Sequence, residues 1–466
     1  MSFVSIVFFQ FFAAVLLSQV AVRNARARHV LLLVASYVFY GWWDWRFCGL
    51  MLFLTAVAYL AGLAMERRPG RRWVLAVGVA VPLLVLFFFK YMNFFVDTFC
   101  TAFGVARPGA LRIILPVGIS FYTFQSLSYT IDVYRGKLPA SRDPVKFALY
   151  IAFFPQLVAG PIVKASEFLP QLDEDRGPTA RRVFRGLTEM FYGMFKKAVL
   201  ADQIAVFADS VFAAVGAYSS ATVALAVTGY AMQIYFDFSG YSDMAAGAAR
   251  CLGYDLPMNF NRPYIARNIS EFWKRWHISL SSWLQQYLYI PLGGNRKGAA
   301  RTYLNLMITM ALGGLWHGAN WTFVAWGTLH GLALCVHKLW ARRFPPRPGA
   351  WRRAASTALT AAFVCLMWVF FRARSFEHAA LIFRRLFAFA PGANNPSAWT
   401  LLAMAFLAAR AVRFAVLARR EGHPVDEHPP MLKYGSFWGT LGLTLLAGLA
   451  VLLMYTGDSP FIYFQF

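Results

Sequence analysis

Two histidines, His317 and His277, are the side chains of this sequence best suited to move a proton near neutral pH. His317 lies in residues 312–321, which read LGGLWHGANW, and the glycines of this segment allow another backbone or a substrate to approach closely. An ionisable side chain in such an apolar run is costly to bury and is a candidate functional group. A buried histidine without an acidic neighbour is favoured in its neutral form, which can take a proton from a hydroxyl group. We therefore predict that His317 is a general base; the alternative is a structural histidine hydrogen-bonded between helices.

His277 lies within residues 268–290, which the pattern predicts to be one amphipathic helix in the membrane interface. The apolar face of this helix holds Trp273, Trp276, Leu280, Trp283, Leu284 and Tyr287. The polar face holds Lys274, Arg275, Ser281, Ser282, Gln285 and Gln286. Asn268 and Glu271 are spaced as an N-cap and its capping partner. His277 falls at the border of the two faces, so it is expected to be either a polar residue at headgroup level or a second functional histidine.

Further polar side chains could bind a substrate or an acyl donor. Asp237 and Asp243 could cap a helix, pair with cations or orient a substrate hydroxyl, and Asn320 is a candidate to stabilise an oxyanion. A basic group could hold lipid headgroups or the phosphates of a carrier such as coenzyme A, and both alternatives stay open. This group comprises Arg262, Arg267, Lys274, Arg275, Arg296, Lys297 and Arg301. The candidate binding residues are Asn320, Asp237, Asp243, Arg262, Lys274, Arg275 and Trp316.

Several classes of site are not expected. His330 and His337 could share a helix face, but no His-Glu-x-x-His or comparable spacing is present, so we predict no metal and no bound cofactor. The sequence has no Walker A loop, no glycine-rich dinucleotide turn and no Gly-x-Ser-x-Gly elbow. No soluble module is long enough to carry a nucleic-acid site.

The composition indicates an all-α, polytopic membrane protein. Of 466 residues, 59% are hydrophobic and 14% charged, well below the roughly 25% charged residues of soluble chains. Apolar runs that could cross a bilayer include residues 4–22, 47–65, 73–89, 221–236, 355–371 and 437–455. Two prolines and a glycine interrupt residues 148–163, which we interpret as a broken or re-entrant helix. The lengths predict about 11 spans of roughly 20 residues each, with re-entrant and interfacial helices.

The net charge of +24 is concentrated in loops and is interpreted chiefly as a topology signal. Arg23, Arg26 and Arg28 follow the apolar run 4–22, and Arg67, Arg68, Arg71 and Arg72 follow the run 47–65. If basic loops are cytoplasmic, the N-terminus is outside and the turn at Asp44 is outside as well. We expect a single domain over 1–466, with N-terminal hairpins in 1–110, a catalytic core in 111–340 and C-terminal helices in 341–466.

The sequence closely resembles the membrane-bound O-acyltransferases (MBOAT), in particular the bacterial branch that includes the membrane subunit of alginate O-acetyltransferase. The motifs that carry this resemblance are residues 36–40, 115–125, 153–161, 233–243, 272–280, 289–295, 314–321 and 461–466. Members of the branch commonly carry Arg-Asp where this chain has Gln285-Gln286.

The resemblance implies a catalytic His317, a second important His277 and a ring of helices around a tunnel. It also implies that the protein lies in the bacterial inner membrane and takes an acetyl group from a cytoplasmic thioester donor, acetyl-CoA. The acetyl group would be delivered outward to an exported polysaccharide such as alginate. A periplasmic or secreted acetyltransferase is the expected partner, besides membrane lipids. The alternatives are peptidoglycan, cellulose or teichoic acid as acceptor, or a glycan or lipid transporter without acyl transfer.

Overall fold

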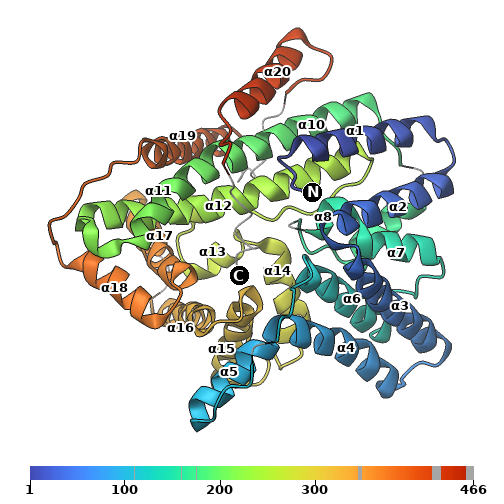
Figure 1. Ribbon diagram of the computed structural model, residues 1–466, viewed down its shortest axis with the longest axis horizontal. Helices are drawn as coiled ribbons and strands as arrows, with labels where there is room; N and C mark the ends of the chain where they lie inside the picture. Colours follow the sequence, from blue (N-terminus) through green and yellow to red (C-terminus); the bar gives the residue numbers. More distant parts are fainter. Residues whose placement is uncertain (110, 159, 175, 345–348, 422–431, 458–466) are drawn as a thin grey trace. The chain divides into compact units, whose positions relative to one another are not determined.

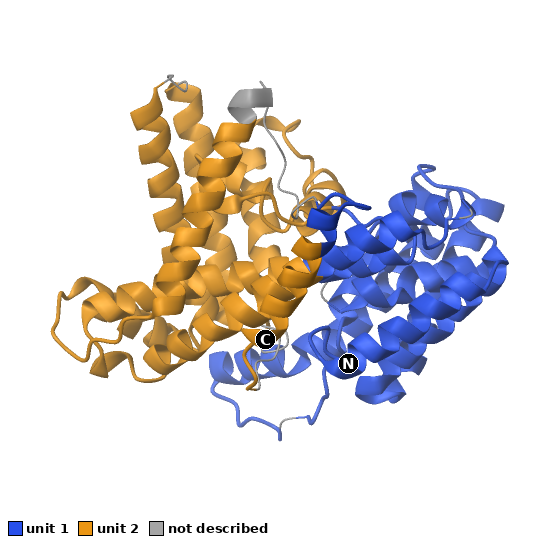
Figure 2. Cartoon of the chain, turned by 90° about the horizontal axis from the view of Figure 1, so that it is seen from above, with its two compact units in different colours: residues 1–190, 242–257, 432–440 blue, residues 191–241, 258–431, 441–466 orange. Residues whose placement is uncertain are grey.

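The structure is a computed structural model that describes residues 1–466 except 110, 159, 175, 345–348, 422–431 and 458–466. The segment 461–466, part of the resemblance, therefore lies outside the described residues. The residues fall into two compact units (Figure 2). Unit 1 comprises Met1–Met190, Ser242–Pro257 and Leu432–Thr440, and unit 2 comprises Phe191–Tyr241, Met258–Met431 and Leu441–Phe466. The expected subdivision at residues 110 and 340 stays a prediction.

The described part of the chain is helical and holds no β-strand, apart from an isolated bridge between Tyr218 and Ala393. The first part runs α1 (Ile6–Ala21), α2 (Ala25–Asp44), α3 (Arg46–Arg67), α4 (Arg72–Leu86), the π-helical η1 (Phe87–Tyr91), α5 (Met92–Phe103), α6 (Ile119–Tyr134), α7 (Pro144–Ala152), α8 (Phe154–Leu157), α9 (Ala165–Asp173) and α10 (Ala180–Met194). Then follow η2 (Phe195–Ala201), α11 (Asp202–Ala213), η3 (Val215–Ala217), α12 (Ser220–Cys251), η4 (Pro263–Ile265), α13 (Ile269–Trp273), α14 (Ile278–Leu284) and η5 (Gln285–Tyr289). The last are α15 (Gly298–His317), α16 (Trp321–Arg343), α17 (Ala350–Arg372), α18 (Phe376–Phe387), α19 (Ala398–Glu421) and α20 (Phe437–Leu452). Figure 1 labels most of the α-helices.

Several helices are long and apolar enough to cross a bilayer, as a multi-pass membrane protein requires. They are Arg46–Arg67, Arg72–Phe103, Ala350–Arg372 and Ala398–Leu417, and Ile6–Ala21 and Phe437–Leu452 are shorter apolar helices. The predicted total of about 11 spans stays a prediction. The predicted break within residues 148–163 is confirmed, because α7 ends at Ala152 and α8 begins at Phe154 with Pro155 in its first turn.

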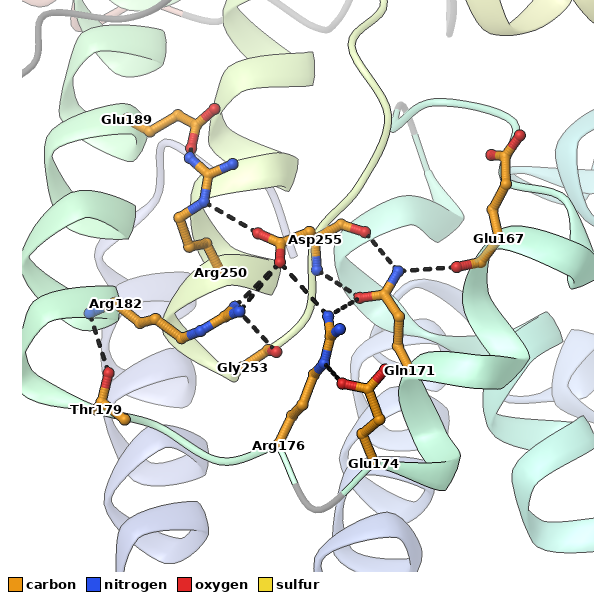
Figure 3. A network of polar contacts seen from close by, with 10 residues as sticks. All are labelled: Glu167, Gln171, Glu174, Arg176, Thr179, Arg182, Glu189, Arg250, Gly253 and Asp255. Atoms are coloured by element: carbon orange, nitrogen blue, oxygen red, sulfur yellow. Dashed lines mark hydrogen bonds and ion pairs between the residues drawn. The ribbon is translucent and has the colours of Figure 1, made fainter.

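A polar network in unit 1 ties three helices to the chain that follows α12 (Figure 3). The Asp255 carboxylate pairs with Arg182 at 3.2 Å, with Arg250 at 3.3 Å and with Arg176 at 3.6 Å. The backbone of Asp255 also exchanges hydrogen bonds with the Gln171 side chain, its N–H donating at 2.8 Å and its carbonyl accepting at 2.9 Å. The network thus joins α9, α10 and the end of α12 without involving either candidate histidine.

Two glycines let α15 and α16 pack closely in unit 2, where these helices lie side by side in Figure 1. A Cβ atom at Gly314 would overlap the Phe323 carbonyl oxygen and lie 3.1 Å from Cα of Gly327. A Cβ atom at Gly327 would in turn overlap the Met310 carbonyl oxygen. The close backbone approach predicted for the glycines before His317 is therefore found at Gly314. It places the end of α15 directly against α16.

Candidate functional site

His317 is the last residue of α15, and its environment fixes which ring nitrogen carries hydrogen. Its Nδ1 lies 2.7 Å from the Gly313 carbonyl oxygen, one helical turn earlier. A carbonyl oxygen only accepts hydrogen bonds, so Nδ1 donates and the lone pair of the neutral ring is on Nε2. The ring is buried, only 4% exposed. His317 therefore has the tautomer that a general base needs, with Nε2 as its basic atom.

Aromatic side chains from three helices enclose His317. Its ring centroid lies 5.1 Å from Trp316, 5.0 Å from Trp326 on α16 and 5.5 Å from Phe371 on α17. Trp326 also contacts His330, whose ring centroid lies 4.9 Å from that of Trp326. These rings limit the rotation of His317 and keep the surroundings apolar.

His277 is not at the border of a continuous helix, and the prediction of one helix over residues 268–290 is wrong. The helix α13 ends at Trp273, α14 begins at Ile278, and residues 285–289 form the π-helical η5. His277 interrupts the helix with a left-handed backbone, φ 44° and ψ 56°. Its side chain is fully buried, and its ring centroid lies 6.5 Å from that of His317. The structure therefore brings the two candidate histidines together.

The break has a physical cause in the chain before α13. The Asn261 N–H donates to the Arg275 carbonyl and the Ile278 N–H donates to the Asn259 carbonyl, each at 2.9 Å. These two bonds use backbone groups that a continuous helix would pair internally.

Burial and the neighbouring His317 lower the pKa of His277 well below its usual range, so its ring is neutral.

A cavity of about 650 Å³ opens beside His317 in unit 2. Trp326 and Arg342 line it from opposite parts of α16, about 24 Å apart along the axis at 1.5 Å per residue. Its wall is mainly apolar, and its basic residues are Lys274, Lys338 and Arg342. The remaining polar lining includes Ser270, Ser281, Gln285, Asn295, Thr309 and His337. The cavity is therefore an elongated space that is lined by His317 and by three basic side chains.

The basic group predicted from the sequence divides into different roles. Arg275 and Arg267 pair with Glu271 at 2.8 and 3.0 Å, while Lys274 lines the cavity. Burial alone would raise the pKa of Glu271, but hydrogen bonds from the two arginines outweigh it and lower that pKa. The Arg262 guanidinium lies 4.4 Å from the centroid of the Phe414 ring. Lys274 is thus the member of this set that the structure places at the cavity.

The predicted N-cap of this segment is confirmed in part. The Asn268 side chain accepts a hydrogen bond from the Glu271 N–H at 2.8 Å. The Glu271 carboxylate accepts a hydrogen bond from the backbone N–H of Arg267, whereas a capping box would have it accept from the N–H of Asn268.

The other candidate polar residues make structural contacts of their own. Asp237 is buried and pairs with Lys197 at 2.7 Å, whereas Asp243 belongs to unit 1. The Asn320 side chain caps α16 by accepting from the Thr322 N–H at 2.9 Å and donates to the Arg374 carbonyl at 3.1 Å. This arrangement favours a structural role for Asn320. Trp316 lies within 6.0 Å of the His277 ring, between centroids.

Sequence reasoning assigned no functional role to Asn259, Trp326, Lys338 or Arg342. The Asn259 side chain contacts His277 from 18 positions earlier in the chain, a separation that no local pattern reveals. Lys338 and Arg342 are spaced by one helical turn at the end of α16, and this spacing could have indicated from the sequence that the two cations share a helix face. Among the described residues, no group of three or more His, Cys, Asp or Glu is arranged to hold a metal ion.

Comparisons with known proteins agree with the resemblance described above. The chain is 40% identical to the probable alginate O-acetylase AlgI of Pseudomonas putida over the whole length of both proteins. It is 42% identical to the Pseudomonas aeruginosa protein of the same name, over 84% of this chain and 75% of that protein. It is 37% identical to the peptidoglycan O-acetyltransferase of Helicobacter pylori, over 78% of this chain and 75% of that protein.

The sequence profile of the MBOAT, membrane-bound O-acyltransferase family matches residues 42–378, which include both histidines and the cavity. The chain therefore belongs to the membrane-bound O-acyltransferase family and is a multi-pass membrane enzyme that transfers acyl groups to oxygen.

Proposed function

We propose that this protein transfers an acetyl group from cytoplasmic acetyl-CoA toward an exported polysaccharide such as alginate. The acetyl group would pass to the acceptor directly or through a periplasmic partner, with the protein in the bacterial inner membrane. The support is the similarity to alginate O-acetylases over the entire chain, together with His317 beside an elongated cavity.

The observation that most supports this proposal is the hydrogen bond from Nδ1 of His317 to the Gly313 carbonyl, which leaves Nε2 as the basic atom. Nε2 removes the proton of an acceptor hydroxyl, and the oxygen attacks the carbonyl carbon of the thioester. The carbon–sulfur bond then breaks, and the sulfur takes the proton back from the His317 imidazolium. The products are an acetyl ester and the free thiol of coenzyme A, so no proton is gained or lost overall.

The cavity supports a donor with a long arm and a charged end. Lys274, Lys338 and Arg342 would hold phosphate groups, since ammonium and guanidinium groups are the usual protein partners of phosphate. The apolar wall would hold the arm of the donor and exclude water that would hydrolyse the thioester.

The test is release of coenzyme A from acetyl-CoA by the purified protein in nanodiscs. We expect His317→Gln to lower the rate by about 10²–10⁴-fold, the contribution typical of a general base. His378→Gln is the matched control, because His378 lies on α18 and does not line the cavity. Equal rates for wild type and His317→Gln would refute His317 as the base, and absence of turnover by the wild type would refute unassisted use of acetyl-CoA.

The acceptor is a separate question. The relative from Helicobacter pylori is named for peptidoglycan, so that polymer is the second candidate acceptor. Mass spectrometry of the cell-surface glycans with and without the gene would identify the polymer that loses acetyl groups. Membership in an acyltransferase family favours the enzyme over a transporter without acyl transfer.

A further inference from the structure

The side-chain amide of Asn259 determines the hydrogen-bonding state of His277. Its Oδ1 lies 3.1 Å from Nδ1 of His277, 3.3 Å from the Ser279 backbone nitrogen and 2.9 Å from Oγ of Ser279. A backbone N–H can only donate, so the Asn259 atom that faces it is the oxygen. The same oxygen faces Nδ1 of His277, and Nδ1 therefore carries the hydrogen.

The same segment also holds the backbone of His277. The Asn259 carbonyl accepts from Ile278, and the left-handed conformation at His277 is one that L side chains rarely adopt. Asn259 thus contacts the residues on both sides of the break through its backbone and its side chain. Both Asn259 and His277 are buried, at 3% and 0% exposure.

The other ring nitrogen of His277 is a buried acceptor. Nε2 has no hydrogen-bond partner among the residues that the structure describes. The ring is surrounded by Phe238 at 4.6 Å, Trp316 at 6.0 Å and His317 at 6.5 Å between centroids. His317 is the titratable group of this set, and Phe238, Trp316, Asn259 and Ser279 carry no ionisable group. Because buried polar atoms in proteins are nearly always paired, an unpaired acceptor beside the candidate base points to a partner that binds there.

We propose that Asn259 is a positioning residue that holds His277 as the neutral Nδ1–H tautomer, so that Nε2 accepts a hydrogen bond from a substrate O–H or N–H group. This inference rests on the proposed function, because it places His277 in the acyl-transfer site. In this state His277 has no proton at Nε2 to give to the leaving sulfur. His317 therefore carries out both proton transfers, and His277 holds the substrate.

Nitrogen-15 NMR of the protein in proteoliposomes, with histidine labelled in the ring, tests the tautomer without any activity. Comparison with His277→Gln assigns the His277 signals, and protonated and bare ring nitrogens have well-separated chemical shifts. We expect one nitrogen of each kind in the wild type across the neutral pH range. Asn259→Ala should lose this fixed pattern, whereas Ser279→Ala, which keeps the Asn259–His277 bond, should retain it.

Asn259→Asp adds a readout that loss of structure would not produce. A carboxylate next to Nδ1 favours the charged ring, so the pKa of His277 should rise and both nitrogens should become protonated as the pH falls. Coenzyme A release by this variant should then decline on the acid side, with an apparent pKa that the wild type lacks. A His277 spectrum that is the same in wild type, Asn259→Ala and Asn259→Asp would overturn the inference.

The two proposals fail in different ways. If the wild type does not release coenzyme A, the acetyl-CoA proposal is refuted while the spectra still decide the role of Asn259. If the wild type is active and the spectra do not change with Asn259, only the positioning role is refuted.

Discussion

At the scale of single residues, each candidate histidine owes its chemistry to an oxygen atom at Nδ1. The oxygen is the Gly313 carbonyl for His317 and the Asn259 amide for His277. Because both oxygens accept, both rings present Nε2 as the basic nitrogen. The two residues differ in their backbone, since His317 ends a helix and His277 interrupts one. The shared tautomer gives the site two acceptors and no neutral N–H donor at Nε2.

A buried ion cluster in unit 2 gives a prediction at this scale. Lys197 is 1% exposed and pairs with Asp202 and Asp237, each at 2.7 Å. Removing the lysine takes away the cation that pairs with two buried carboxylates, and breaking a buried pair in this way typically costs about 3–5 kcal/mol. We therefore expect Lys197→Met to lower the thermal midpoint strongly, as measured by size exclusion of detergent-solubilised protein after heating.

The matched control for this cluster is Lys146→Met. Lys146 pairs with Asp173, whose side chain is 70% exposed, and such a pair contributes at most about 1 kcal/mol. Equal midpoints for the two variants would contradict a stabilising role for the buried cluster.

At the scale of elements, the amphipathic pattern of residues 268–290 correctly predicted helical structure but not the break that divides it into separate helices. The faces were assigned on the assumption that the helix pairs its own backbone groups throughout. The segment 259–261 competes for the groups at Arg275 and Ile278, and the helix breaks between α13 and α14. This break turns His277 from a border position into the interior. A local pattern contains no information on such a competing segment.

The crossing of α15 and α16 is the element-scale feature most sensitive to a single methyl group. Gly327→Ala would place its Cβ against the Met310 carbonyl oxygen and 3.0 Å from Cα of Gly314. Overpacking of this kind usually costs about 1–3 kcal/mol, and here it would also move Trp326 away from His317. We expect lower thermal stability together with reduced coenzyme A release.

Gly49→Ala on α3 is the control for that substitution, because a Cβ at Gly49 meets nothing within 4 Å. Its stability and turnover should equal those of the wild type or rise slightly, since alanine is the better helix former. Wild-type behaviour of Gly327→Ala would show that the helix crossing tolerates greater separation.

At the scale of the whole molecule, the distribution of basic residues predicts which loops face the cytoplasm. Arg67, Arg68, Arg71 and Arg72 surround the turn between α3 and α4, while the turn between α2 and α3 holds the Asp44–Arg46 ion pair. Clusters of arginine near span ends remain on the cytoplasmic side. The two turns at the ends of α3 should therefore lie on opposite sides of the membrane.

Cysteine accessibility measures this topology in a variant whose five native cysteines are replaced. We expect Trp45→Cys to react with a membrane-impermeant maleimide in intact cells, and Pro69→Cys to react only after the membrane is opened. Both positions are exposed in the structure, so a lack of reaction reflects the membrane and not burial. The reverse pattern would invert the predicted orientation.

The sequence by itself determined the membrane class, the family and the broken segment near Pro155, and it singled out His317 as a candidate base. These conclusions depend on composition, on apolar run length and on motifs that are contiguous in the chain. Only the tertiary structure decided that His277 is buried 6.5 Å from His317 between ring centroids, that Asn259 fixes its tautomer and that Lys338 and Arg342 share the cavity with Trp326. It also showed that Asp237 takes part in a buried ion cluster and that Asn320 caps a helix. The physical reason is that ring orientation, backbone strain and ion pairing depend on atoms supplied by residues distant in sequence.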